Sequence, residues 1–152
     1  MQADLDMSGR IEETSRPTVL ALANGLTASI RITAREKRKV LNALRQHRSQ
    51  WSRTLVNVYV FSVLVYLVLR DHIEKMSLVI IDLEYSGYEA VIKNRVLTLC
   101  RRQGVTVYKD QITFHRVGKK SPAHILAFKV YKRLVEPDQV VTADDVLAEF
   151  GE

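Results

Sequence analysis

Two acidic residues close an apolar segment in the middle of the chain, Ser77 to Tyr85 (SLVIIDLEY). Side chains two residues apart on a strand point to the same face, so Asp82 and Glu84 share one side of this predicted strand. Two carboxylates held together need a cation to offset their repulsion, and hard divalent metals prefer oxygen ligands. Glu89, in the first turn of the next predicted helix, offers a third oxygen. These acids predict a site for Mg²⁺ or Mn²⁺; the alternative is a strand end with one acid salt-bridged and the other solvated.

A glycine and two lysines precede another predicted helix, in the sequence Gly118-Lys119-Lys120-Ser121-Pro122. Ser121 is suited to cap this helix, and Pro122 is suited to its first position. Helix N-termini bind phosphate through their free amides and the helix dipole, and adjacent lysines would strengthen such a site. The segment therefore predicts a phosphate contact. The alternative is an ordinary exposed loop before a well-capped helix.

His124 falls in the first turn of that helix. A histidine there can act as a general base or orient a phosphate, and the alternative is a side chain that caps or packs. The predicted catalytic residues are Asp82, Glu84 and His124. A single reaction site requires the acids to lie within about 10 Å of the Gly118 loop, so that one phosphate can contact both.

The charge distribution favours a polyanionic partner. The net charge is +6, and residues 34–53 hold seven Lys and Arg against Glu36, while residues 93–133 hold eleven against Asp110. Basic surfaces attract nucleic acid because neutralised phosphates release their counterions. The alternative is a solvated surface with salt bridges. The residues predicted to contact nucleic acid are Arg35, Lys37, Arg38, Arg116, Lys119, Lys120 and Ser121.

The composition indicates one folded domain in a reducing compartment. With 152 residues, 47% of them hydrophobic, the chain is long enough to bury a core. Cys100 is its single cysteine, which excludes an intramolecular disulfide and a cysteine-based zinc site within one chain. The uncharged stretch Thr54–Leu69 is shorter than the roughly 20 residues of a membrane-spanning helix, so it predicts a buried core element. We expect a cytoplasmic protein without a membrane segment.

The elements that must position these side chains follow from periodicity and turn residues. Residues 1–16 show no apolar periodicity and stop before Pro17, which predicts a flexible acidic arm, and a single domain covers residues 17–152. Asn24-Gly25 predicts a hairpin turn. The predicted elements are a hairpin over 18–33, helices over 34–46 and 55–75, a strand over 77–85, a helix over 88–103, a strand over 111–117, a helix over 121–133, a strand over 139–141 and a helix over 142–150. Their order predicts an α/β fold with a mixed, partly parallel central sheet of about five strands, covered by helices.

Three segments carry a resemblance to a known superfamily. They are a glycine-containing hairpin (VLALANGLTASIRIT), an acid-ended strand leading into a helix (LVIIDLEYSGYEAVIK), and a late strand and helix (ITFHRVGKKSPAHILAFKVYK). They resemble the ribonuclease H-like nucleases, integrases and resolvases, in which the first strand, the central strand and the closing helix bring acids or a histidine near two metal ions. The resemblance implies a ribonuclease H-like fold, with Asp82 as the central-strand aspartate and His124 as the late polar residue.

Asn24 stands where the resemblance places the first aspartate. Either Glu84 and Glu89 rebuild the metal site, or the protein binds nucleic acid without cleaving it. Three hypotheses for the function follow. The leading one is a divalent-metal-dependent nuclease that hydrolyses DNA or RNA with metal-activated water. The second is a catalytically inactive nucleic-acid-binding module, and the third is a protein-interaction adaptor that uses its acidic tail and its apolar helix as a homodimer surface.

Overall fold

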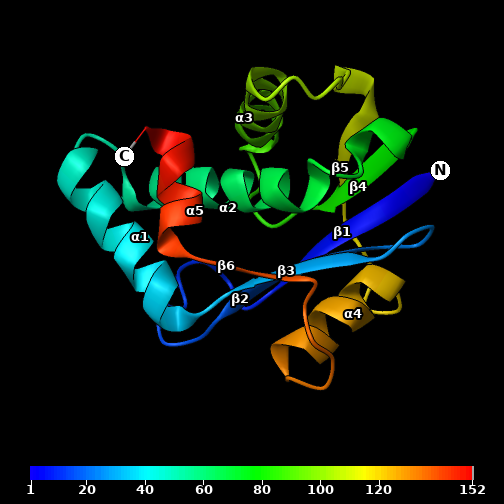
Figure 1. Ribbon diagram of the computed structural model, residues 1–152, viewed down its shortest axis with the longest axis horizontal. Helices are drawn as coiled ribbons and strands as arrows, with labels where there is room; N and C mark the ends of the chain where they lie inside the picture. The colour runs from blue at the N-terminus through cyan, green and yellow to red at the C-terminus, as the bar shows by residue number, and fades with distance from the viewer. Residues whose placement is uncertain (152) are drawn as a thin grey trace.

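The computed structural model describes residues 1–151, which form an α/β fold (Figure 1). In this part of the chain six strands make one sheet, in the order β5-β4-β1-β2-β3-β6. The strands are β1 (Gln2–Ser8), β2 (Thr18–Ala23), β3 (Ala28–Ile32), β4 (Leu78–Asp82), β5 (Ile112–His115) and β6 (Gln139–Val141). The helices are α1 (Ala34–His47), α2 (Arg53–Leu69), α3 (Glu89–Arg102), α4 (Pro122–Tyr131) and α5 (Ala143–Leu147), with short 3-10 turns η1 (Ile73–Lys75), η2 (Lys109–Gln111) and η3 (Ala148–Phe150).

The sheet is mixed and partly parallel, which confirms the predicted fold class, and it has one strand more than the five expected. β1, β2 and β3 form an antiparallel meander. On the other side of β1, β4 runs parallel to β1 and β5 runs parallel to β4, while β6 pairs in parallel with β3 at the far edge. The carboxyl ends of the neighbouring strands β1 and β4 therefore lie side by side, at the same end of the two strands.

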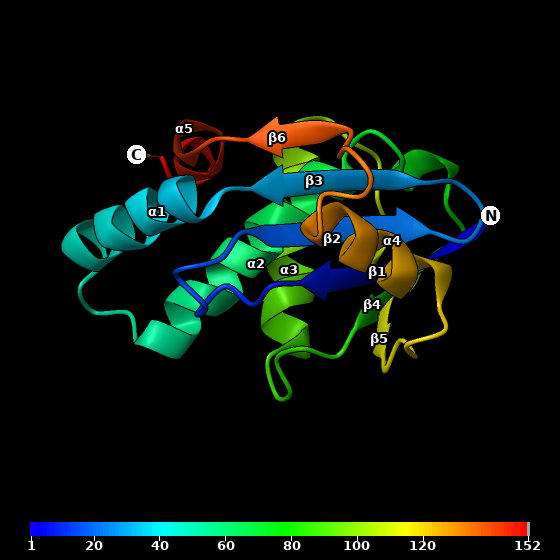
Figure 2. The same cartoon turned by 90° about the horizontal axis from the view of Figure 1, so that it is seen from below.

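Helices cover both faces of the sheet (Figures 1 and 2). α2 lies against one face, with α3 packed on its outer side. α4 covers β1 and β2 from the opposite face. α1 and α5 pack on each other beyond the end of the sheet.

α2 accounts for the long uncharged stretch of the sequence. Its N-cap is Ser52, whose Oγ accepts a hydrogen bond from the Leu55 amide. Every residue from Val60 to Leu69 is buried, because the sheet, α3 and α5 surround the helix. The prediction of a buried helix is confirmed, and no helix within the described residues is long and apolar enough to cross a membrane.

The prediction of a flexible arm over residues 1–16 is wrong, because Gln2–Ser8 form a central strand that pairs with both β2 and β4. The two faces of β1 differ. Its apolar residues in the main core are Ala3, Leu5 and Met7. Asp4 and Asp6 alternate with them and point toward α4, where each carboxylate meets a polar side chain. The acids on this second face gave the segment the composition of a solvated tail, although its alternation is that of a strand.

Candidate active site

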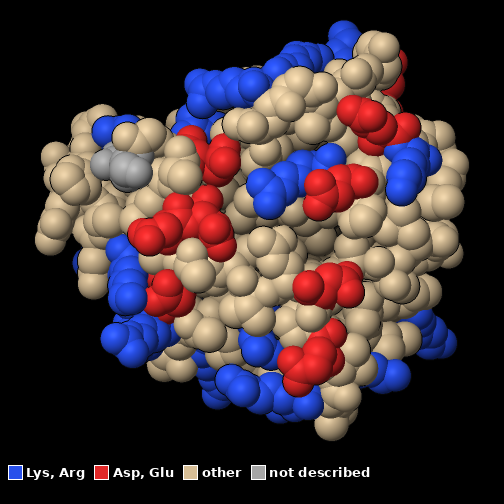
Figure 3. All heavy atoms as spheres, viewed as in Figure 1, with Lys and Arg blue, Asp and Glu red and all other residues tan. Residues whose placement is uncertain are grey.

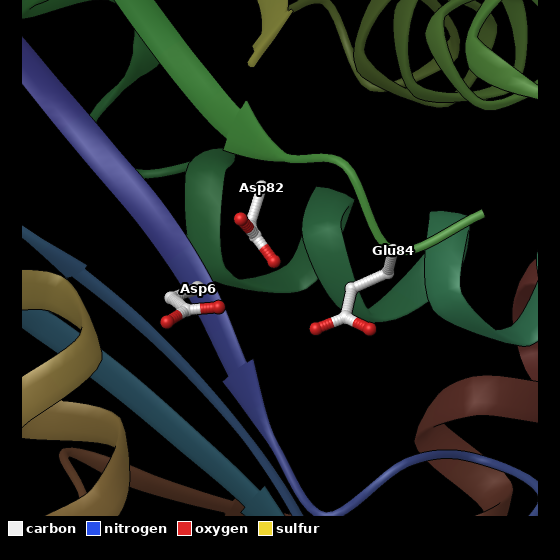
Figure 4. A group of neighbouring side chains, drawn as sticks. All are labelled: Asp6, Asp82 and Glu84. Atoms are coloured by element: carbon white, nitrogen blue, oxygen red, sulfur yellow. The ribbon is translucent and has the colours of Figure 1, made fainter. Parts of the chain in front are cut away.

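Three acids meet at the carboxyl ends of β1 and β4 (Figure 4). The parallel register pairs Leu5 with Ile81, so the residues that follow them, Asp6 and Asp82, lie next to each other. Glu84 comes from the segment directly after β4, and its side chain extends toward the same space. Each of the three side chains offers one oxygen, and these oxygens all lie within 4.8 Å of one another. Carboxylate oxygens at this spacing could hold a metal ion.

The three carboxylates are partly withdrawn from water. Burial raises the pKa of Asp6, whose side chain is 4% exposed, although the Met7 amide opposes this by donating to its Oδ1 over 2.8 Å. Burial and then the nearby Asp82 carboxylate raise the pKa of Glu84 to about 7. Asp82 itself accepts a hydrogen bond of 2.7 Å from the Val117 amide. The cluster gathers negative charge that a bound cation would stabilise.

α4 brings a histidine to the same place. The Nδ1 atom of His124 lies 2.7 Å from Oδ2 of Asp6, while its side chain stays 37% exposed. One turn earlier, Ser121 caps α4: its Oγ accepts from the Ala123 amide and donates to Oδ2 of Asp4 over 3.1 Å. The two acids on one face of β1 thus hold the first turn of α4, and with it His124.

A cleft of about 500 Å³ opens over the acids. Three cationic residues line it together with the carboxylates, namely Arg10, Arg116 and Lys119. The other lining residues are Asp6, Met7, Asp82, Leu83, Glu84, Val117, Gly118 and His124. The acids and the Gly118 loop therefore share one cleft, as a single reaction site requires. Oxygen ligands for a metal and cations for a phosphate are available side by side.

The structure brings together five of the side chains that the sequence singles out, and it places others elsewhere. The five are Asp82, Glu84, Arg116, Lys119 and His124. Glu89 does not join the metal cluster, because its Oε1 accepts a hydrogen bond from the Gly87 amide within the turn before α3. Lys120 is exposed beside the cleft and does not line it, and Ser121 acts as the cap of α4.

The prediction of nucleic-acid contact is wrong for Lys37, which is fully buried. Its ammonium donates to the carbonyl oxygens of Arg10 and Glu13 and to Oγ1 of Thr18 over 2.8 to 3.0 Å. These three bonds use all the donors of the ammonium and fix the loop between β1 and β2. Lys37 therefore positions Arg10 rather than contacting a ligand itself.

The other two basic residues predicted on α1 also lie outside the cleft. Arg35 is exposed, and Arg38 is exposed while it donates to the Thr14 carbonyl over 2.9 Å. Their contact with nucleic acid stays a prediction, for a surface separate from the acids.

Sequence reasoning missed Asp6 and Arg10. The available signal was the alternation of small or apolar residues with Asp4 and Asp6, which is typical of a strand with one polar face. Asn24, which the resemblance places at the first acidic position, lies instead in the turn between β2 and β3, where its φ of 78° suits asparagine. The acid that accompanies Asp82 is Asp6.

Comparisons with protein-family models, with curated proteins and with solved structures found no match to this chain.

Proposed function

We propose that this protein is a divalent-metal-dependent phosphodiesterase of ribonuclease H-like type that acts on nucleic acid. The observation that carries the proposal is one cleft in which Asp6, Asp82 and Glu84 converge and which Arg10, Arg116 and Lys119 also line. A cluster of acids with only a structural role does not require an open cleft that cationic side chains also line. Metal-assisted cleavage of a phosphodiester requires acids to hold the metal ion and benefits from cations that contact the phosphate.

The donor set fits Mg²⁺ or Mn²⁺, because these ions prefer carboxylate oxygens. Asp6, Asp82 and Glu84 would hold the metal, which would polarise the phosphate and lower the pKa of bound water. Arg10, Arg116 and Lys119 would neutralise the charge on the phosphate oxygens. His124, anchored on Asp6, can accept or release a proton in the same cleft.

The arrangement of elements supports the ribonuclease H-like part of the proposal. Asp6 lies on the first strand, ahead of the hairpin formed by β2 and β3. Asp82 closes β4, and His124 lies on the late helix α4. These are the three positions at which the resemblance expects metal-binding or polar residues. Asn24 favours a catalytically inactive protein, whereas the position of Asp6 on the first strand supports an active one.

The proposal is tested by the change Asp82→Asn, which keeps the shape of the side chain and removes one anionic oxygen ligand. We expect Mn²⁺ and Mg²⁺ binding to weaken and cleavage to fall on the order of 100-fold or more, as is typical when an electrostatic contact at a reacting group is lost. Binding of uncleaved nucleic acid should stay within about twofold, because the cations remain. Calorimetric titration of the metals and cleavage assays on labelled single-stranded, duplex and branched substrates measure these effects.

Asp144→Asn is the matched control, since Asp144 lies in the first turn of α5 and outside the cleft. It should bind metal and cleave like the wild-type protein. Absence of metal binding in the wild type, or undiminished cleavage by Asp82→Asn, would refute the proposal. Metal-independent binding without cleavage would identify a binding module.

A further inference from the structure

A second hollow lies between α2 and α3 and shares no residue with the acidic cleft. It measures about 310 Å³. Four of its lining residues come from one face of α3 and the fifth from α2; they are Val91, Asn94, Arg95, Thr98 and Tyr59. The groove thus combines an apolar wall, an aromatic ring, two neutral polar side chains and a cation.

Arg95 is held in this groove by aromatic rings. Its guanidinium carbon lies 4.6 Å from the ring centroid of Tyr59 and 5.3 Å from that of Phe150. The Nε atom is buried and has no hydrogen-bond partner. Among residues 1–151, no acidic side chain forms an ion pair with Arg95. The rings fix the guanidinium, but they do not neutralise it.

Neighbouring cations further destabilise the positive charge of Arg95. Burial lowers the pKa of Arg95; Tyr59 opposes this, and Arg102 and Arg48 lower the pKa further. The α3 segment from Glu89 to Arg102 carries four Lys and Arg against one acid. Figure 3 shows Lys and Arg atoms along the edge of the molecule where Figure 1 places α3, whereas Asp and Glu atoms gather over α5. An anion in the groove would relieve the repulsion among these guanidinium groups.

We propose that the groove between α2 and α3 binds a phosphate group, with the Arg95 guanidinium as its charged contact. The guanidinium plane and its fixed donors match the geometry of phosphate oxygens. Asn94 and Thr98 can donate hydrogen bonds from the same face of α3. The identification of this phosphate as part of a nucleic-acid strand rests on the proposed function, and a free mononucleotide is the other source of the same chemistry.

The test uses the full chain in EDTA, so that metal binding in the acidic cleft does not contribute. Fluorescence anisotropy measures the affinity for labelled single-stranded DNA and RNA of about 12 nucleotides, a length within the usual range of single-strand sites, at several KCl concentrations. Arg95→Gln should weaken binding about fivefold to tenfold and lower the slope of log affinity against log salt by about one. Lys129→Gln, on α4 across the sheet, removes one charge elsewhere and should change affinity less than about twofold.

Two further variants keep the test decisive if Arg95→Gln folds poorly. Arg95→Lys retains the charge and should recover part of the affinity. The double change Asn94→Ala with Thr98→Val leaves the aromatic contacts of Arg95 in place and should still weaken binding. If neither Arg95→Gln nor this double variant weakens binding, Arg95 only clamps α3 against Tyr59 and Phe150, and the proposal is wrong.

Amide chemical shifts of Asn94, Arg95 and Thr98, followed while AMP, UMP or inorganic phosphate is added, separate the two sources. Shifts with mononucleotides at low concentration, without an effect of Arg95→Gln on strand binding, would assign the groove to a free nucleotide. The cleavage assay tests the proposed function separately. If the protein never cleaves nucleic acid but Arg95→Gln still weakens strand binding, the proposed function fails and the phosphate site in the groove stands.

Discussion

Glu84 has an energetic cost in the metal-free protein that depends on pH. Its pKa is raised to about 7 in the folded chain, first by burial and then by Asp82, whereas the ordinary value is 4.5. Folding therefore favours the protonated carboxyl. The contribution of this group to stability is full below pH 4.5 and is lost as the pH rises to about 7.

This cost predicts that Glu84→Gln stabilises the metal-free protein at pH 8. The gain should be about 1–3 kcal/mol, since one pKa unit corresponds to about 1.4 kcal/mol and the neighbouring acids share the effect. The gain should shrink toward zero near pH 5, where Glu84 in the wild type is largely protonated. Urea unfolding of both proteins in EDTA at the two pH values measures the difference. A gain of equal size at both values would mean that ionisation of Glu84 is not its cause.

Lys37 links the stability of the protein to the shape of the cleft. Its ammonium donates to the carbonyls of Arg10 and Glu13, which also accept hydrogen bonds from the backbone amides of Glu13 and Arg16. Thr18 adds a hydrogen bond of 3.4 Å from its Oγ1 to the Arg10 carbonyl. Lys37 is thus both a structural residue and the support of a cationic side chain in the cleft.

Lys37→Met keeps the apolar stem and removes the donors. We expect a loss of about 1–3 kcal/mol of unfolding free energy, the usual contribution of hydrogen bonds from a charged donor. We also expect weaker nucleic-acid binding, because the loop that carries Arg10 is released. Arg35→Met, at an exposed position of the same helix, should leave the free energy of unfolding nearly unchanged. Chemical denaturation measures the unfolding free energy, and fluorescence anisotropy measures the affinity for nucleic acid. Unchanged affinity in Lys37→Met would show that the loop carrying Arg10 does not contribute to binding.

The contact between α4 and β1 decides where His124 lies. Ser121 closes the first turn of α4 with one bond to the Ala123 amide and reaches Asp4 with another. The inner face of α4 packs on the sheet in a cluster separate from the main core. This cluster consists of Val19, Ala21, Ala127 and Val130, with Leu126 and Tyr131 packed against it. The polar bonds to β1 add to this apolar contact in placing the helix.

Ser121→Ala should therefore cost about 1 kcal/mol, as is usual for the loss of an N-cap. Part of that cost belongs to the bond with Asp4, so the double variant with Asp4→Ala should lose less than the sum of the single variants. Thermal and urea unfolding of the four proteins of this cycle provide the coupling energy. Strict additivity would show that Ser121 and Asp4 do not interact in solution.

Most elements of the fold could be predicted from the sequence. Thr33, Ser52 and Thr142 each cap a helix, and the uncharged residues of α2 require a buried position. β1 was missed because a strand with acids on its second face has the composition of a solvated tail. The acids on this face are explained only by the polar side chains that they meet at the start of α4. These lie more than a hundred residues later in the chain, so the local sequence does not reveal them.

Asp82 and Glu84 could be predicted as a pair from their local spacing, but the other residues of the acidic cleft could not. Asp82 and Glu84 lie two residues apart, but Asp6 reaches them only through the parallel pairing of β1 with β4. Arg10 and Lys119 enter the same cleft from two different loops. Charge along the chain indicated an anionic partner, yet it could not separate buried Lys37 from the exposed cations, because burial depends on packing rather than on sequence neighbours.

The central position of β1 also shapes how the chain acquires its fold. β1, β2 and β3 can pair as soon as they leave the ribosome, but the other edge of β1 has no partner until Leu78–Asp82 has been made. In the interval the apolar residues of α2 emerge, while α3 and α5, which pack against α2 in the folded protein, are absent. An open strand edge beside an uncovered apolar helix is a starting point for aggregation. The same pairing that completes the acidic cluster therefore also closes an open edge of the nascent chain.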